Sequence, residues 1–251
     1  MTGPLADLAL GAAVFLALLA GAWFGSLLRR RVPGHMLDGE AKEVVRLGMA
    51  LLASIAALVL SLLISSSYGV YEAQRNDLRT LAADVINLDN TLRLYGEPAQ
   101  PARALLRAAV VETIGHLWSR PTENLFIQPN STGEKAYLTV LRLAPANEIQ
   151  VTMKAQALQI AAEMSQSRLR LYERSQPDLP GSLIFVLSVW MVCLFISFSL
   201  FSPLKHTSIV ALVLVAFSIA AALFLLLELS EPFSGLVRLS DRPLVRALPP
   251  L

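Results

Sequence analysis

Ionisable side chains are scarce in this chain of 251 residues, because Asp, Glu, Lys and Arg together make up only 16 % of it. A soluble domain of this size carries roughly 25 % charged residues. Hydrophobic residues reach 55 %, and the mean hydropathy is +0.56. This balance indicates an integral membrane protein. The formal net charge of +2 is spread thinly and gives no basic stripe for nucleic acid.

Cysteine and histidine are also rare. The single cysteine, Cys193, allows no disulfide within the chain, and His35, His116 and His206 are scattered. The sequence contains no Gly-rich phosphate loop, no GxSxG elbow and no HExxH motif. We therefore expect no metal, no cofactor, no catalytic residues and no enzyme activity.

Four apolar runs account for the hydrophobic excess, and each has about 20 residues, enough for a helix to cross a bilayer. None holds an ionisable residue at its centre, which argues against an ion-coupled transporter or a proton pump. We expect the first run to be a true span and not a cleaved signal peptide, because no basic residue precedes it and Asp7 lies there instead. The runs are Leu8–Leu28, Leu47–Ser66, Leu183–Phe201 and Ser208–Leu227.

These runs predict an all-α integral membrane protein with four transmembrane helices and a long helical insert outside the membrane, between spans two and three. The expected domains are 1–66 (spans one and two with a short basic loop), 67–182 (the helical extramembrane domain), 183–229 (spans three and four) and 230–251 (a C-terminal tail). Since the number of spans is even, both termini and 67–182 should lie on one side.

The second span shows no stop signal at LLISSSYGVYEAQ (62–74), where the apolar run ends. A heptad pattern begins there instead, and this pattern is typical of a helix that packs along its length against another. We therefore expect one helix from about Gly39 to Tyr95, ended by Gly96 and Pro98. The heptad positions are Tyr71, Leu78, Val85 and Leu92 in one row, and Gln74, Leu81, Leu88 and Tyr95 in the other.

The rest of the insert predicts two more helices. One runs from about Pro101 to Trp118, and a longer one runs from a cap at Asn147 to about Ser175. Residues 121–135 are rich in Pro, Asn, Ser, Thr and Gly and predict a loop. Residues 136–144 fit either a short strand or a turn of helix. The inward faces are Leu106, Val110, Ile114 and Leu117, then Met153, Ile160 or Ala161, Met164 and Leu171.

Small residues recur every fourth position in the first two spans, a spacing that lets helix backbones approach closely in lipid. We expect spans one and two to pack against each other or against another copy. A sharper hypothesis places span two along a narrow ion path. The packing residues of span one are Ala13, Ala17, Gly21 and Gly25, and the candidate pore-lining residues of span two are Ala57, Ser61, Ile64, Ser65 and Tyr68.

Charged residues gather where span four leaves the membrane. Glu228 and Glu231 lie within one turn of each other, Pro232 stops the helix, and Arg238 follows. This cluster is interpreted as an anchor for the end of the span, with a ring of charge at a pore mouth as the alternative.

Several stretches resemble the bacterial bestrophin-like domain family of four-span membrane proteins. They are HMLDGEAKEVVRLGMALLASIAALVLSLLISSSYGVYEAQRNDL (35–78), LRLAPANEIQ (141–150), QALQIAAEMSQSRLRLYE (156–173), VWMVCLFISFSLFSP (189–203) and LFLLLELSEPFSGLVRLSDRPL (223–244). The resemblance implies kinship to bestrophins, which are oligomeric anion channels with a pore along the second span and a cytosolic helical domain.

The resemblance thus implies a homo-oligomeric channel of the bacterial inner membrane that passes anions along an axis lined by span two. Its partners would be membrane lipid, further copies of the chain and small anions. The alternative is a structural or sensory membrane module that acts through its helical domain. The side of that domain stays open, because the cluster Arg29–Arg31 favours a periplasmic location under the positive-inside rule, whereas the bestrophin analogy favours the cytoplasm.

Overall fold

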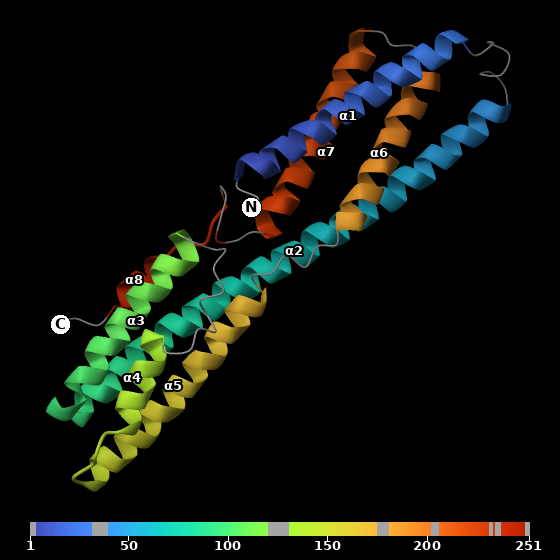
Figure 1. Cartoon of the computed structure of the whole chain (residues 1–251). Coiled ribbons are helices and arrows are strands. Elements are labelled where there is room, and N and C mark those ends of the chain that lie inside the picture. The colour runs from blue at the N-terminus through green and yellow to red at the C-terminus, as the bar shows by residue number, and fades with distance from the viewer. Residues whose placement is uncertain are drawn as a thin grey trace. The chain divides into compact units, whose positions relative to one another are not determined.

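The computed structural model describes residues 4–31, 40–119, 131–174, 181–201, 206–230, 233 and 237–248 (Figure 1). All regular elements among these residues are helical, which confirms the all-α prediction. The chain divides into two compact units. We call Thr2–Gly69 with Asp178–Ser230 the membrane unit, and Val70–Pro177 with Glu231–Leu251 the helical unit.

The membrane unit holds four helices that are long and apolar enough to cross a membrane, as the sequence predicts. They are α1 (Pro4–Arg31), the first part of α2 (Glu40–Tyr95), α6 (Gly181–Phe201) and α7 (His206–Ser230). Helix α1 packs against both α6 and α7. A common apolar cluster includes Leu18 of α1, Ala56 of α2, Leu187 of α6 and Leu226 of α7.

Two glycines bring α1 close to α6. A Cβ atom at Gly25 would overlap the carbonyl oxygen of Ile196, and one at Gly21 would lie 3.2 Å from Cγ1 of Val192. Gly21 lies against Val192, and Gly25, four residues later, lies against Ile196, so α1 and α6 run parallel. The expected packing stripe therefore has a partner in α6 for its two glycines, whereas its other members, Ala13 and Ala17, are exposed within this chain.

The helical unit contains the outer part of α2, η2 (Glu97–Ala99), α3 (Gln100–Ser119), α4 (Thr132–Leu141), α5 (Glu148–Arg174) and α8 (Arg242–Ala247). Its core is built on the heptad rows of α2. Tyr71 is partly buried against that core, and the other members of the rows are buried: Gln74, Leu78, Leu81, Val85, Leu88, Leu92 and Tyr95. The faces expected for α3 and α5 also join this core.

The ends of α2 and α5 follow from their capping residues. Helix α2 ends at Tyr95, and Gly96 adopts a positive φ of 104°, a conformation that favours glycine. The side chain of Asn147 caps α5 by accepting a hydrogen bond from the Gln150 backbone N–H at 2.8 Å. The side-chain amide nitrogen of Gln150, Nε2, donates to the Tyr95 backbone carbonyl at 3.0 Å, so this one residue connects the start of α5 to the end of α2.

The sequence-based reading of 121–135 as a loop is wrong for its last part. Helix α4 begins at Thr132, and the Ser131 side chain caps it by accepting a hydrogen bond from the Glu134 N–H at 3.3 Å. This Ser-x-x-Glu spacing is a helix-start signal, and it decides the open choice for 136–144 in favour of helix through Leu141. Residues 121–130 lie outside the described part of the chain.

The C-terminal segment joins the helical unit. The indole nitrogen of Trp118 donates to the Leu239 carbonyl at 2.8 Å, and its ring meets Phe233 edge-on with centroids 5.7 Å apart. Leu244 and Ala247 of α8 are buried in the same core as α2 and α3. Residues from the end of the sequence therefore complete a core that residues near its middle begin.

Candidate functional site

The part of α2 that belongs to the membrane unit has a buried side. Ala56, Leu63 and Ser67 are 0 %, 7 % and 4 % exposed. These residues recur at steps of seven and four, so they stand above one another on one face of the helix. This face packs into the apolar cluster of the membrane unit.

A second side of α2 carries large apolar side chains. Leu51, Ile55, Leu58 and Leu62 follow one another at steps of three or four, and they are exposed by 48 % to 71 %. Large exposed apolar side chains on a membrane helix suit lipid or a neighbouring subunit. Ser66, four residues after Leu62, adds an exposed hydroxyl to this otherwise apolar side.

The third side carries the small and hydroxyl-bearing residues that the sequence singled out. Ala57, Ser61, Ser65 and Tyr68 are exposed, and Ile64 is half-buried between them and the packed side. At 3.6 residues per turn these positions form a stripe beside the leucine side, not mixed with it. Within the described residues, the candidate pore stripe is thus left uncovered.

The serine hydroxyls in the spans differ in their hydrogen bonds. Ser54, Ser188, Ser218 and Ser230 each donate to the carbonyl four residues earlier, at 2.8 to 2.9 Å. Such bonds occupy the hydroxyl proton and are common for serine in helices. Within the described residues, Ser61 and Ser65 make no such bond, so their hydroxyl protons remain available to an ion or to a neighbouring helix.

Two members of the charged group at the end of span four, Glu228 and Arg238, lie in the described part of the chain. Glu228 is 1 % exposed within the membrane unit and has a polar interaction of its own. Arg238 is exposed in the helical unit, and Glu231 lies outside the described residues. The buried position of Glu228 suits an anchor better than a ring of charge open to solvent.

No group of three or more His, Cys, Asp or Glu side chains that could hold a metal ion occurs among the described residues. The fold defines a class: a four-span membrane protein with an extramembrane helical unit. In the described part of this chain, α2 also carries an uncovered hydroxyl stripe. The model of the family described as Bestrophin-like domain matches residues 16–244. The chain belongs to this bestrophin-like family.

Solved structures show the same fold. Two variants of a bacterial bestrophin homolog from Klebsiella pneumoniae match with TM-scores of 0.68 and 0.67, at 18 % and 17 % identity. Each comparison covers 94 % of this chain and 97 % of the other. A third structure of this homolog, solved by zinc phasing, matches with a TM-score of 0.63 at 18 % identity, over 93 % of this chain and 97 % of the other. No curated protein matches the sequence.

Proposed function

We propose that this protein is the subunit of a homo-oligomeric channel that passes small anions along an axis lined by α2. Bestrophins are oligomeric channels, and family membership supports a channel at that level. The observation that carries the proposal is the hydroxyl stripe of Ala57, Ser61, Ser65 and Tyr68, which no other part of the described chain covers. An axis surrounded by copies of α2 gives this stripe a role.

The chemistry of the stripe suits a weakly binding path. A serine hydroxyl can donate to an anion, and Ala57 leaves room beside it. The stripe carries no fixed charge that would hold an ion tightly, and conduction requires binding weak enough for release. Ile64, at the edge of the stripe, is the apolar residue best placed to narrow the path. In this arrangement the leucine side of α2 meets lipid or the adjacent subunit.

We further propose that the protein lies in the bacterial inner membrane with its helical unit in the cytoplasm. The short cluster Arg29–Arg31 favours the opposite orientation when it is considered alone. Within about 20 residues of the span ends, however, basic residues are more numerous on the side of the helical unit. That side holds Arg75, Arg79, Arg168, Arg170, Arg174, Arg238, Arg242 and Arg246, and the other holds Arg29, Arg30, Arg31, Lys42, Arg46 and Lys205.

Flux measurements on purified protein in liposomes test the channel proposal. We expect chloride to leave chloride-loaded vesicles that contain the protein faster than it leaves protein-free vesicles loaded in the same way. In planar bilayers, the reversal potential should follow the chloride gradient. A reversal potential that follows the cation gradient would contradict anion passage. Absence of any conductance, together with recovery of a specific protein partner, would favour the structural or sensory module instead.

A further inference from the structure

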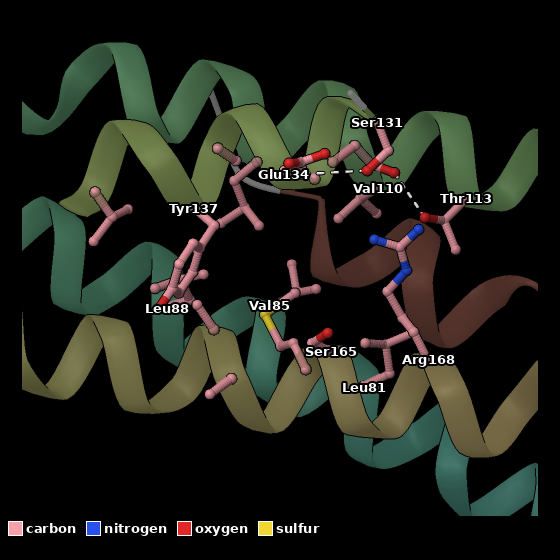
Figure 2. Close-up of a pocket in the computed structure, with 18 of the residues that line it drawn as sticks. Leu81, Val85, Leu88, Val110, Thr113, Ser131, Glu134, Tyr137, Ser165 and Arg168 are labelled. Atoms are coloured by element: carbon pink, nitrogen blue, oxygen red, sulfur yellow. Dashed lines mark hydrogen bonds between the residues drawn. The ribbon is translucent and has the colours of Figure 1, made fainter. Parts of the chain in front are cut away.

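The helical unit contains a partly open cavity of about 630 Å³ between α2, α3, α4, α5 and α8 (Figure 2). Pockets that bind small organic molecules have volumes of about 300–1,000 Å³. Most of the wall is apolar. It consists chiefly of Leu81, Val85, Leu88, Leu106, Val110 and Met164.

Several polar groups of the cavity lie at one end, whereas the Tyr137 hydroxyl lies toward the other end, near Leu88 (Figure 2). Thr113 of α3, the cap residue Ser131, Gly133 of α4 and Arg168 of α5 all line it, and Figure 2 shows Arg168 reaching from α5 toward Thr113 and Ser131. The guanidinium lies against the first turn of α4, because a Cβ atom at Gly133 would be only 2.6 Å from Nη1 of Arg168. Backbone N–H groups in the first turn of a helix lack intrahelical acceptors and favour negative charge.

Arg168 has no acceptor of its own in the described part of the chain. Its Nε is buried without a hydrogen-bond partner, and no described carboxylate lies within ion-pair distance of it. Burial lowers the pKa of Arg168 from its ordinary value, and the charge of Glu112 offsets this effect only in part. Glu134 also lines the cavity, beside Ser131 (Figure 2), and it has a polar interaction of its own.

A cation and the positive end of a helix therefore converge on one end of an apolar cavity. We propose that this cavity is a binding site for an amphipathic organic acid whose carboxylate pairs with Arg168 and whose apolar body fills the space between α2, α3 and α4. A planar carboxylate matches the paired N–H groups of a guanidinium. The hydroxyl of Ser131 can add a further donor to the same head group.

Calorimetric titration of the full-length protein in nanodiscs tests this site, with 4-phenylbutanoate as the probe. The matched ligands are 4-phenylbutan-1-ol, which lacks the charge, and acetate, which lacks the apolar body. We expect saturable binding of 4-phenylbutanoate that is at least about tenfold tighter than binding of either matched ligand, since charge-assisted hydrogen bonds and apolar burial both contribute. Equal binding of the alcohol and the acid would overturn the assignment of the head group.

The variant that removes the cation is Arg168→Gln, and its matched control is Arg170→Gln on the same helix. Arg170 is 45 % exposed, contacts Asp77 at 3.6 Å and does not line the cavity. We expect Arg168→Gln to weaken binding of 4-phenylbutanoate by about tenfold or more, and Arg170→Gln to leave it unchanged. Equal loss in both variants would contradict the site.

A second variant keeps the cation and reduces the space. Ala109 of α3 lines the cavity, so Ala109→Leu should fill part of it while leaving Arg168 in place. We expect 4-phenylbutanoate to bind more weakly and acetate to be unaffected. Unchanged binding of 4-phenylbutanoate by a folded Ala109→Leu protein would place the ligand elsewhere. Mass spectrometry of acids released from the purified protein distinguishes a membrane-derived fatty acid from a soluble acid, and detection of either one supports the site.

Discussion

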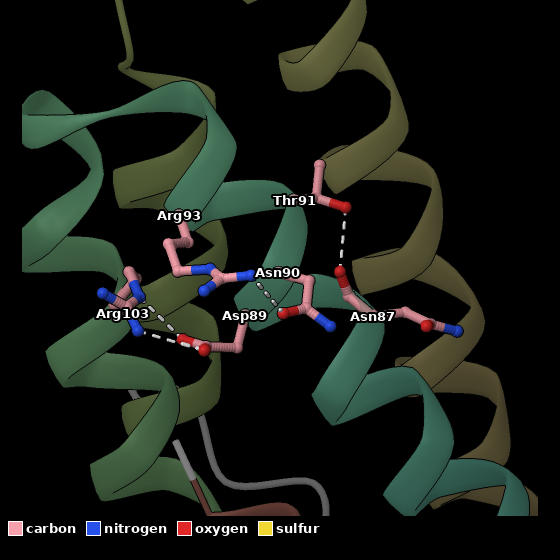
Figure 3. A network of polar contacts seen from close by, with 6 residues as sticks. All are labelled: Asn87, Asp89, Asn90, Thr91, Arg93 and Arg103. Atoms are coloured by element: carbon pink, nitrogen blue, oxygen red, sulfur yellow. Dashed lines mark hydrogen bonds and ion pairs between the residues drawn. The ribbon is translucent and has the colours of Figure 1, made fainter. Parts of the chain in front are cut away.

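Asp89 of α2 and Arg103 of α3 are joined by two parallel hydrogen bonds, Nε to Oδ1 at 2.7 Å and Nη2 to Oδ2 at 3.0 Å (Figure 3). Their side chains are only 10 % and 14 % exposed. The hydrogen bond to Asp89 raises the pKa of Arg103 above its ordinary value. A raised pKa favours the charged form, and the stability that this shift contributes would be lost only as the pH rises through that alkaline pKa.

Removing one member of this pair should destabilise the helical unit. We expect Arg103→Met to lower the free energy of unfolding by about 3 kcal/mol, because it leaves the Asp89 carboxylate buried without its partner. Thermal or denaturant unfolding of the purified protein, followed by circular dichroism, measures the change. The matched control is Glu72→Gln, which breaks the exposed pair with Arg75 and should cost less than about 1 kcal/mol. Equal effects of the two substitutions would contradict a buried pair.

The close approach of α1 and α6 makes a second prediction. Gly25→Ala should cost about 1–3 kcal/mol, because the new methyl group would overlap the Ile196 carbonyl and force the helices apart. Gly48→Ala in α2 is the control, since its Cβ would meet no described atom within 4 Å. That control should be neutral or stabilising, as alanine favours helix over glycine. A thermal melt in detergent ranks the two proteins, and a Gly25→Ala protein as stable as the control would disprove the contact.

The hydroxyl stripe makes a prediction about conductance. If Ser61 and Ser65 face the ion path, loss of one hydroxyl bond of about 1 kcal/mol should change the conductance severalfold in Ser61→Ala or Ser65→Ala. Ile55→Ala, on the leucine side of α2 and further from the stripe, should leave the single-channel conductance unchanged. Recordings in planar bilayers compare the three variants. A change in conductance in the Ile55→Ala variant alone would place the ion path along the leucine side of α2 and contradict the proposed stripe.

The proposed orientation can be checked by cysteine labelling of intact cells. In a background that carries Cys193→Ser, a cysteine at Glu97 of the helical unit should react with a membrane-impermeant maleimide only after the inner membrane is permeabilised. A cysteine at Arg30, near the end of α1, should react in spheroplasts without permeabilisation. The side chains of Glu97 and Arg30 are both exposed in the structure. The reverse pattern would place the helical unit in the periplasm.

The helices could be predicted from sequence wherever one local signal was strong. The heptad rows from Tyr71 to Tyr95 predicted both the length of α2 and its buried face, and Gly96 and Asn147 fixed two helix ends. The four spans followed from apolar length alone. In each of these places, periodicity and capping chemistry agree with the tertiary packing.

The partner of a helix was harder to predict. The spacing of Gly21 and Gly25 predicted a close helix contact. Spacing within one helix carries no information about which helix approaches it, and α6 lies about 170 residues further along the chain. Prediction of the candidate site from the sequence was limited in the same way. The residues that line the cavity come from five helices. Considered from the sequence without these neighbours, Arg168 cannot be distinguished from an ordinary surface arginine. Only the folded arrangement places it at the end of an apolar space.

The contact between Trp118 and the C-terminal segment has a consequence for how the protein is made. Phe233, Leu239 and Leu244 belong to the core that α2 and α3 begin, yet they leave the ribosome after α6 and α7. The insertion machinery must therefore deliver all four spans before the helical unit can close its core. Until then the exposed apolar surface of α2 and α3 would be a natural substrate for chaperones.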